Sequence, residues 1–91
     1  MRLRWSSKAL SDLVGLHEFL SVGSKGAAAR AVKGLTAAVG KLAHHPRLGE
    51  PMPEFEEREV RRLVVGQYEI RYAVANSSVT ILRLWHTREE R

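Results

Sequence analysis

In the first quarter of the chain, polar and apolar side chains alternate briefly, and the apolar positions then take on the spacing of a helix. Residues 2–5 alternate polar and apolar side chains, which predicts a short first strand. Ser6 or Ser7 can then cap a helix that starts at Lys8, because a side-chain oxygen there accepts unpaired backbone N–H groups. The apolar positions that follow have the spacing of one helix face: Ala9, Leu13, Leu16 and Leu20, with Leu10 and Phe19 widening the stripe.

A second helical pattern follows a break at residues 22–24. Ser24 can cap this helix, which we expect to run to about Ala43. Its apolar stripe consists of Ala28, Ala31, Val32, Leu35, Val39 and Leu42. Because so short a break leaves the two helices side by side, the pattern predicts an antiparallel helical hairpin.

The last third of the chain has a period of two. Residues 62–65 and 68–74 read as strands around a Gly-Gln turn, and the second of them has one apolar face. A final strand over 79–85 is apolar on both faces except at Arg83, so we expect it to be central. The order is β-α-α-β-β-β. It predicts an α+β fold in which a helical hairpin packs on a small, mainly antiparallel sheet.

The segment between the helices and the later strands is irregular and acidic. Three prolines and Gly49 mark a connector over residues 44–57. Residues 50–59 hold five glutamates and one arginine: Glu50, Glu54, Glu56, Glu57, Glu59 and Arg58. We expect this acidic band to be solvated, between two segments in which Lys and Arg outnumber Asp and Glu.

Composition narrows the class of protein. Ninety-one residues form one domain spanning 1–91, and the chain carries a net charge of +5. There are no cysteines, so disulfides, zinc knuckles and thiol nucleophiles are excluded and a reducing cytoplasm is expected. No signal peptide or membrane-spanning stretch is visible. His44 and His45 have no third ligand at a useful spacing, so we expect no metal site, and no motif indicates a cofactor.

Several segments resemble a known family in their order and spacing. A short strand ends in Trp5-Ser6 and leads into a helix that contains Asp12, and residues 42–49, 61–72 and 81–88 follow with matching turns and strands. Together they resemble the RelE/ParE superfamily of toxins from type II toxin–antitoxin systems, and the ParE branch, also called plasmid stabilisation proteins, most closely. The resemblance implies a bacterial cytoplasmic toxin that a cognate antitoxin holds inactive.

The superfamily divides by target, and the residues must decide between two activities. RelE-like members cut mRNA on the ribosome, whereas ParE-like members poison DNA gyrase without hydrolytic chemistry. RelE-like enzymes carry an arginine just after the aromatic residue that opens the penultimate strand, but this chain has Glu69 there. A carboxylate at that place repels a phosphate, and we expect Glu69 to pair with Arg71 as a surface charge pair.

Some groups that RNA cleavage would use are nevertheless present. The resemblance to the YoeB-like branch assigns Glu50 as general base, and His86 and Arg88 as catalytic groups near the chain end. The tyrosine that follows the histidine in that branch is Thr87 here. Alternation places His86 with Leu82 and Leu84 on an apolar face, so only a bulge or a strand end would turn it outward. An mRNA endonuclease using Glu50, His86 and Arg88 is therefore the alternative function.

A non-catalytic toxin would act through its surfaces. Arginines surround Trp85 near the chain end, and Trp and Arg are enriched in binding hot spots. We therefore expect a target contact formed by Arg83, Trp85, Arg88 and Arg91, with Trp85 partly exposed. For the antitoxin, a small acidic protein with a segment that folds on binding, the candidate charge partners are Lys8, Arg30 and Lys33.

Direct nucleic-acid binding is a further alternative, since the sequence pI is near 10.2. Two observations argue against nucleic-acid binding. The sequence has no recognition-helix pattern, and the glutamates of residues 50–59 would repel a nucleic-acid backbone. A family member that has lost its toxicity is also compatible with the sequence. We favour a ParE-like, non-catalytic gyrase poison in a hetero-oligomeric complex with its antitoxin.

Overall fold

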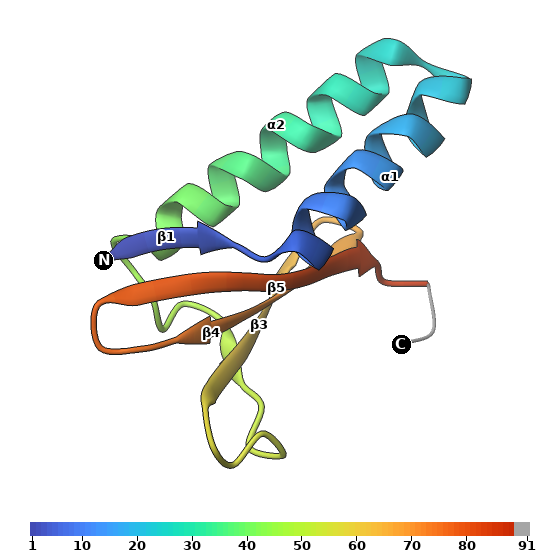
Figure 1. The fold of residues 1–91 in the computed structure, drawn as a ribbon. Helices are drawn as coiled ribbons and strands as arrows, with labels where there is room; N and C mark the ends of the chain where they lie inside the picture. Colours follow the sequence, from blue (N-terminus) through green and yellow to red (C-terminus); the bar gives the residue numbers. More distant parts are fainter. Residues whose placement is uncertain (89–91) are drawn as a thin grey trace.

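The computed structural model describes residues 1–88, and in this part of the chain two helices cover one face of a five-stranded sheet (Figure 1). The elements in chain order are β1 Arg2–Trp5, α1 Ser7–Gly23, α2 Lys25–Leu42, β2 Glu50–Pro51, β3 Glu59–Val65, β4 Tyr68–Val74 and β5 Ser78–His86. The predicted α+β architecture is confirmed. The short strand β2, inside the segment expected to be irregular, is an addition to the predicted order.

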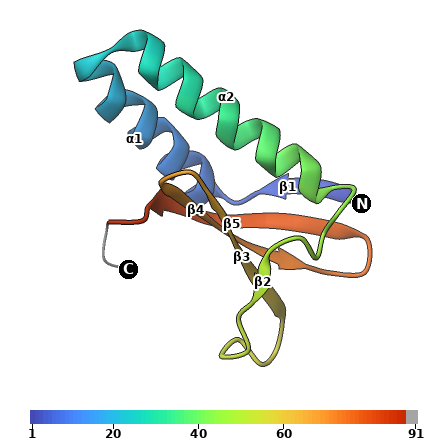
Figure 2. The same ribbon diagram turned by 180° about the vertical axis from the view of Figure 1, so that it is seen from behind.

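The sheet has the strand order β1-β5-β4-β3-β2. β5 pairs in parallel with β1 and antiparallel with β4, and the remaining neighbours are antiparallel. The prediction of a central last strand in a mainly antiparallel sheet is therefore confirmed. Figure 2 shows the connector and β2 at the edge of the sheet that lies opposite β1.

Two serines fix the ends of the helices. The Ser6 hydroxyl oxygen accepts the Ala9 N–H at 3.0 Å and donates to the Leu82 carbonyl at 2.8 Å, so it joins the start of α1 to β5. Ser24 ends α1 by donating its backbone N–H to Leu20, and its side chain accepts the Ala27 N–H at 3.1 Å to begin α2. One residue therefore produces the predicted antiparallel hairpin (Figure 1).

The main core lies between the hairpin and the sheet. Its buried members are Ala9, Leu35, Val39, Leu42, Ile70, Tyr72, Val74, Val79, Ile81 and Leu84. Leu10 and Phe19, expected in the apolar stripe of α1, are exposed instead, at 49% and 76%. The loop end of the hairpin projects beyond the sheet (Figure 1), so this part of α1 has no strand to cover it.

A bulge in β5 sets the direction of its last side chains. Tyr72 pairs with Ile81 and Arg71 pairs with Arg83, so Leu82 has no partner in β4. Because one extra residue inverts the alternation, Leu84 and His86 face the hairpin and Trp85 faces the other side of the sheet. The expected grouping of His86 with Leu84 is therefore correct, but Leu82 does not belong to it.

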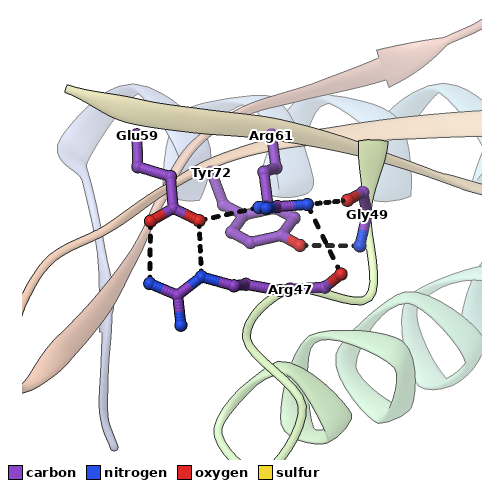
Figure 3. A network of polar contacts seen from close by, with 5 residues as sticks. All are labelled: Arg47, Gly49, Glu59, Arg61 and Tyr72. Carbon is purple, nitrogen blue, oxygen red and sulfur yellow. Dashed lines mark hydrogen bonds and ion pairs between the residues drawn. The ribbon is translucent and has the colours of Figure 1, made fainter. Parts of the chain in front are cut away.

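The connector is attached to the sheet by a polar network (Figure 3). The buried Tyr72 hydroxyl accepts the Gly49 N–H at 2.8 Å, and the Arg61 guanidinium donates to the Gly49 carbonyl at 2.7 Å. A side chain at residue 49 is excluded, because its Cβ would lie 2.5 Å from the Arg62 carbonyl oxygen. Burial raises the pKa of Tyr72.

Glu59 is the charged centre of this network rather than part of a solvated acidic band. Its carboxylate accepts from Arg61 at 2.8 Å and from Nη2 and Nε of Arg47 at 2.9 and 3.0 Å (Figure 3). The hydrogen bonds from Arg61 and then Arg47 hold the pKa of Glu59 below its usual value. The sequence prediction was wrong here because β3 begins at Glu59, three residues earlier than the alternating pattern indicated.

Candidate functional site

An apolar groove of about 640 Å³ lies between α1 and the ends of β4 and β5. We call it the α1–β5 groove. Its lining residues are Ser11, Asp12, Gly15, Leu16, Phe19, Leu20, Tyr68, Leu84, Trp85, His86 and Arg88. It lies where the end of β5 comes beneath α1 (Figure 1).

The groove combines a hydrophobic wall with a cation. Phe19, on the wall contributed by α1, is 76% exposed, and Arg88 is an exposed lining residue just after β5. Concave surfaces lined mainly by apolar side chains and a few polar groups are typical binding sites. An exposed aromatic ring and a cation that line the same groove give it the chemistry of a protein-binding surface.

Asp12 closes one side of the groove by binding the free edge of β5. β1 ends at Trp5, which pairs with Ile81, so the next residues of β5 have no strand on that side. The Asp12 carboxylate takes the place of a strand by accepting the Leu84 N–H at 3.0 Å. It also accepts from Arg83 Nε at 2.8 Å and from Nη2 at 3.1 Å.

This arrangement changes the interpretation of Arg83. The predicted target-contact residue is held in a two-point ion pair within the chain, and its side chain is 30% exposed. Planar guanidinium–carboxylate pairs of this kind fix both partners in one orientation. Arg83 therefore braces β5 against α1, and Arg88 extends beyond this braced strand.

Both ring nitrogens of His86 are engaged within the chain. The Arg88 backbone N–H donates to Nδ1 at 3.1 Å, and Nε2 lies 3.1 Å from the Gln67 side-chain oxygen. The Tyr68 ring meets the imidazole edge-on, with ring centroids 5.5 Å apart. His86 stays on the hairpin side of the sheet with Leu84, where it lines the groove at the end of β5.

Trp85 is buried, which corrects the expectation of partial exposure. It is 6% exposed and lies on the face of the sheet opposite the hairpin. The guanidinium of Arg71 lies over its ring at 4.8 Å and over the Phe55 ring at 5.5 Å. Phe55 comes from the connector and contacts the same guanidinium. The Arg71 side chain therefore covers a tryptophan that sequence position alone suggested would be accessible.

The expected pairing of Glu69 with Arg71 is also replaced. Glu69 lies 3.7 Å from Arg62 Nη1, and Arg62 also binds Glu50 at 3.2 Å. The Arg71 Nε is buried with no hydrogen-bond partner among the described residues. Stacking on two aromatic rings therefore takes the place of the expected ion pair.

Glu50 and His86 do not form one centre in this chain. Glu50 follows the register Glu50–Arg62–Arg71–Arg83 on the face opposite the hairpin, whereas His86 faces the hairpin side. Three strand spacings and three residues along the strand separate their Cα atoms by roughly 17 Å. Of the three candidate catalytic residues, the fold brings together only His86 and Arg88.

The candidate antitoxin contacts are exposed but spread along the hairpin. Lys8 lies in the first turn of α1, whereas Arg30 and Lys33 lie in the first half of α2. Arg91, a candidate target contact, lies outside the described residues. Sequence reasoning missed Phe19 as a surface group, because helical spacing alone does not reveal where the sheet beneath a helix ends.

Within residues 1–88, no cluster of three or more His, Asp or Glu side chains is arranged to hold a metal ion. No helix within it is long and apolar enough to cross a membrane.

Comparison with known proteins identifies the class of protein that this fold and groove define. The family model described as "ParE toxin of type II toxin-antitoxin system, parDE" matches residues 3–91. The chain is 35% identical over 82 residues to "Toxin RelE2" of Caulobacter vibrioides, an alignment that covers 90% of each protein. The chain therefore belongs to the ParE toxin family of type II toxin–antitoxin systems, and the family implies a complex with an antitoxin partner.

A solved structure has the same fold. A chain of "Chromosomal ParDE TA system from P. aeruginosa" superposes with a TM-score of 0.79 at 25% sequence identity. The superposition covers 94% of this chain and 95% of the other. The resemblance drawn from the sequence is thereby confirmed at the level of family and fold.

Proposed function

We propose that this toxin inhibits DNA gyrase in the bacterial cytoplasm as a non-catalytic poison and is neutralised by its cognate antitoxin. One observation carries the choice between the two activities of the superfamily. The general base that cleavage would require, Glu50, lies on the opposite face from His86, and both nitrogens of His86 are bonded within the chain. Acid–base catalysis needs such groups within reach of one substrate.

The groove is the surface that supports a binding activity. Arg88 is exposed at its lining, and Phe19 offers a large apolar contact beside it. We assign the direct target contact to Arg88 and the groove wall, with Arg91 as a further cation. Trp85 and Arg83 support this contact from beneath, because one is buried and the other is paired with Asp12.

For the antitoxin we propose an acidic segment that folds across the hairpin. Lys8, Arg30 and Lys33 are exposed and lie on the two helices away from the sheet. Positive side chains there, on a chain of net charge +5, speed encounter with an acidic partner. The contact is then completed by apolar groups of the hairpin, such as Leu10 and Val14, which are 49% and 56% exposed.

Ribosome-dependent mRNA cleavage is the second candidate. The observation in its favour is that His86 and Arg88 lie together at one groove, as two of the three residues for that chemistry. Histidine is the side chain most suited to proton transfer near neutral pH. In this case Glu50 would need a replacement as the base.

Induction of the toxin in bacteria without its antitoxin tests the proposal. DNA and protein synthesis are followed separately by pulse labelling. We expect DNA synthesis to fall first, and Arg88→Ala to delay the fall. The matched control is Lys25→Ala, which removes an exposed cation at the far end of the hairpin and is expected to act like the wild type. An earlier collapse of protein synthesis would contradict the proposal and favour mRNA cleavage.

A further inference from the structure

The histidine at the end of β5 has a more specific role than lining the groove. We propose that His86 is a positioning residue: its Nδ1 turns the chain after β5 and thereby holds Arg88 at the α1–β5 groove. The part of this inference that concerns toxicity rests on the proposed function. The part that concerns the position of Arg88 stands on the geometry alone.

The turn is made by a hydrogen bond between residues two apart. The Arg88 backbone N–H donates to His86 Nδ1 at 3.1 Å. An Asn or Asp side chain makes the same connection in an Asx-turn, where its oxygen accepts the N–H two residues on. Here an imidazole nitrogen replaces that oxygen, and Arg88 leaves the strand in the direction of the groove.

Two further contacts attach the turn to the sheet. The Thr87 N–H donates to the Gln67 carbonyl at 2.8 Å, and the Gln67 side-chain oxygen lies 3.1 Å from His86 Nε2. Gln67 belongs to the tight turn between β3 and β4, next to Gly66 with its positive φ of 60°. The residues after β5 are therefore tied by backbone and side chain to a rigid neighbouring turn.

The hydrogen-bond pattern fixes the tautomer of His86. A backbone N–H can only donate, so Nδ1 must carry a lone pair and the ring proton sits on Nε2. Nε2–H then donates to the Gln67 oxygen, which can only accept. To act as a base, His86 would have to give up the bond that places Arg88. Positioning and acid–base chemistry are thus competing uses of one nitrogen.

Two substitutions separate these uses. His86→Asn keeps an acceptor in the place of Nδ1 and removes the reach to Gln67. His86→Gln keeps a group that reaches Gln67 and loses the acceptor two residues before Arg88. Neither variant carries an imidazole, so neither can perform histidine acid–base catalysis. Both truncate a partly buried ring beside Tyr68, which makes them matched controls for stability.

Toxicity on induction is the first measurement. We expect His86→Asn to remain within about twofold of the wild type in the inhibition of DNA synthesis, and His86→Gln to lose about fivefold or more, the effect of one lost hydrogen bond. Equal and complete loss in both variants would overturn the inference in favour of imidazole chemistry. Equal retention in both would overturn it as well, because the acceptor would then have no role.

The second measurement does not depend on any target. In the purified toxin, nitrogen-15 NMR of His86 should show the proton on Nε2, and the Arg88 amide should exchange slowly with solvent. That protection should survive in His86→Asn and be lost in His86→Gln. A proton on Nδ1, or rapid Arg88 exchange in the wild type, would overturn the inference. If these signatures hold while the wild type inhibits neither DNA nor protein synthesis, the proposed function fails and the positioning role stands.

Discussion

The carboxylate of Asp12 binds both the backbone and the side chain of the last strand, through the Leu84 N–H at 3.0 Å and the Arg83 guanidinium at 2.8 Å. It does so where β1 has ended and β5 has lost its outer neighbour. An unpaired strand edge is a liability that proteins cover with a side chain or another element. In this toxin Asp12, a helical residue, provides part of that cover, and it also lines the groove.

Replacing Asp12 should therefore lower the stability of the fold by more than a substitution near the surface usually does. Asp12→Ala leaves the Leu84 N–H without its acceptor and the Arg83 guanidinium without its carboxylate, which we expect to lower the free energy of unfolding by about 1–3 kcal/mol. Urea denaturation of the purified toxin measures this. Asp12→Asn keeps one acceptor oxygen and should lie between Asp12→Ala and the wild type. An Asp12→Ala midpoint equal to that of the wild type would contradict the bracing role.

Gly49 offers a test of the connector. A Cβ at this position would lie 2.5 Å from the Arg62 carbonyl oxygen and 2.8 Å from the Tyr72 hydroxyl oxygen. Gly49→Ala must displace backbone, so we expect it to destabilise the fold by about 1–3 kcal/mol.

The matched control is Gly34→Ala in α2, where a Cβ meets nothing within 4 Å. This substitution should stabilise the helix by about 0.5–1 kcal/mol, because alanine loses less backbone freedom than glycine on folding. Thermal unfolding of the two variants should therefore give midpoints on opposite sides of the wild type. A Gly49→Ala midpoint equal to or above that of the wild type would show that the close approach at Gly49 is absent.

The network around Glu59 predicts a pH dependence of stability. Arg61 and Arg47 hold the pKa of Glu59 in the folded chain below its ordinary value of 4.5. The stabilisation is therefore complete above pH 4.5 and is lost as the pH falls through the lower, folded-state pKa. Glu59→Gln should reduce the loss of stability on acidification, relative to the wild type, in unfolding experiments below pH 4.5. Parallel curves for the two proteins would contradict this contribution.

Charge reversal on the hairpin tests the antitoxin surface. Arg30→Glu combined with Lys33→Glu should slow association with an acidic antitoxin by tenfold or more at low salt, because electrostatic attraction raises the encounter rate. Stopped-flow or surface-based kinetics measure the association rate. Arg4→Glu, on the exposed strand β1 at the sheet edge, is the control for net charge. The association rate could fall by the same factor per reversed charge in the double variant and in this control. In that case the hairpin is not the specific contact.

The sequence predicted the fold well, because its periodicities are strong and local. The serine caps at Ser6 and Ser24 and the alternation of residues 68–74 each depend on near neighbours. The site was predicted less well, because it depends on where elements end relative to one another. The exposure of Phe19 follows from a sheet that stops beneath α1, and Trp85 lies under the guanidinium of Arg71 from the neighbouring strand β4.

The bulge in β5 is a further feature that the sequence did not predict, and it depends on a single extra residue. Strict alternation placed Leu82, Leu84 and His86 together, but the extra residue in β5 separates Leu82 from the other two. Nothing in the local sequence marks this irregularity, since it arises from the register of β5 against β4. Likewise, the Gln67 partner of His86 comes from a turn nineteen positions earlier in the chain, which only the folded sheet brings near.

Purified DNA gyrase provides the most direct test of the central claim. The toxin is added to gyrase, supercoiled plasmid and ATP, and cleaved plasmid is measured after protein removal. The account predicts that linear plasmid accumulates with the wild type and with His86→Asn, that Arg88→Ala gives less, and that the antitoxin abolishes the effect. Unchanged cleavage and supercoiling at saturating toxin, together with mRNA cleavage in a reconstituted translation reaction, would contradict it.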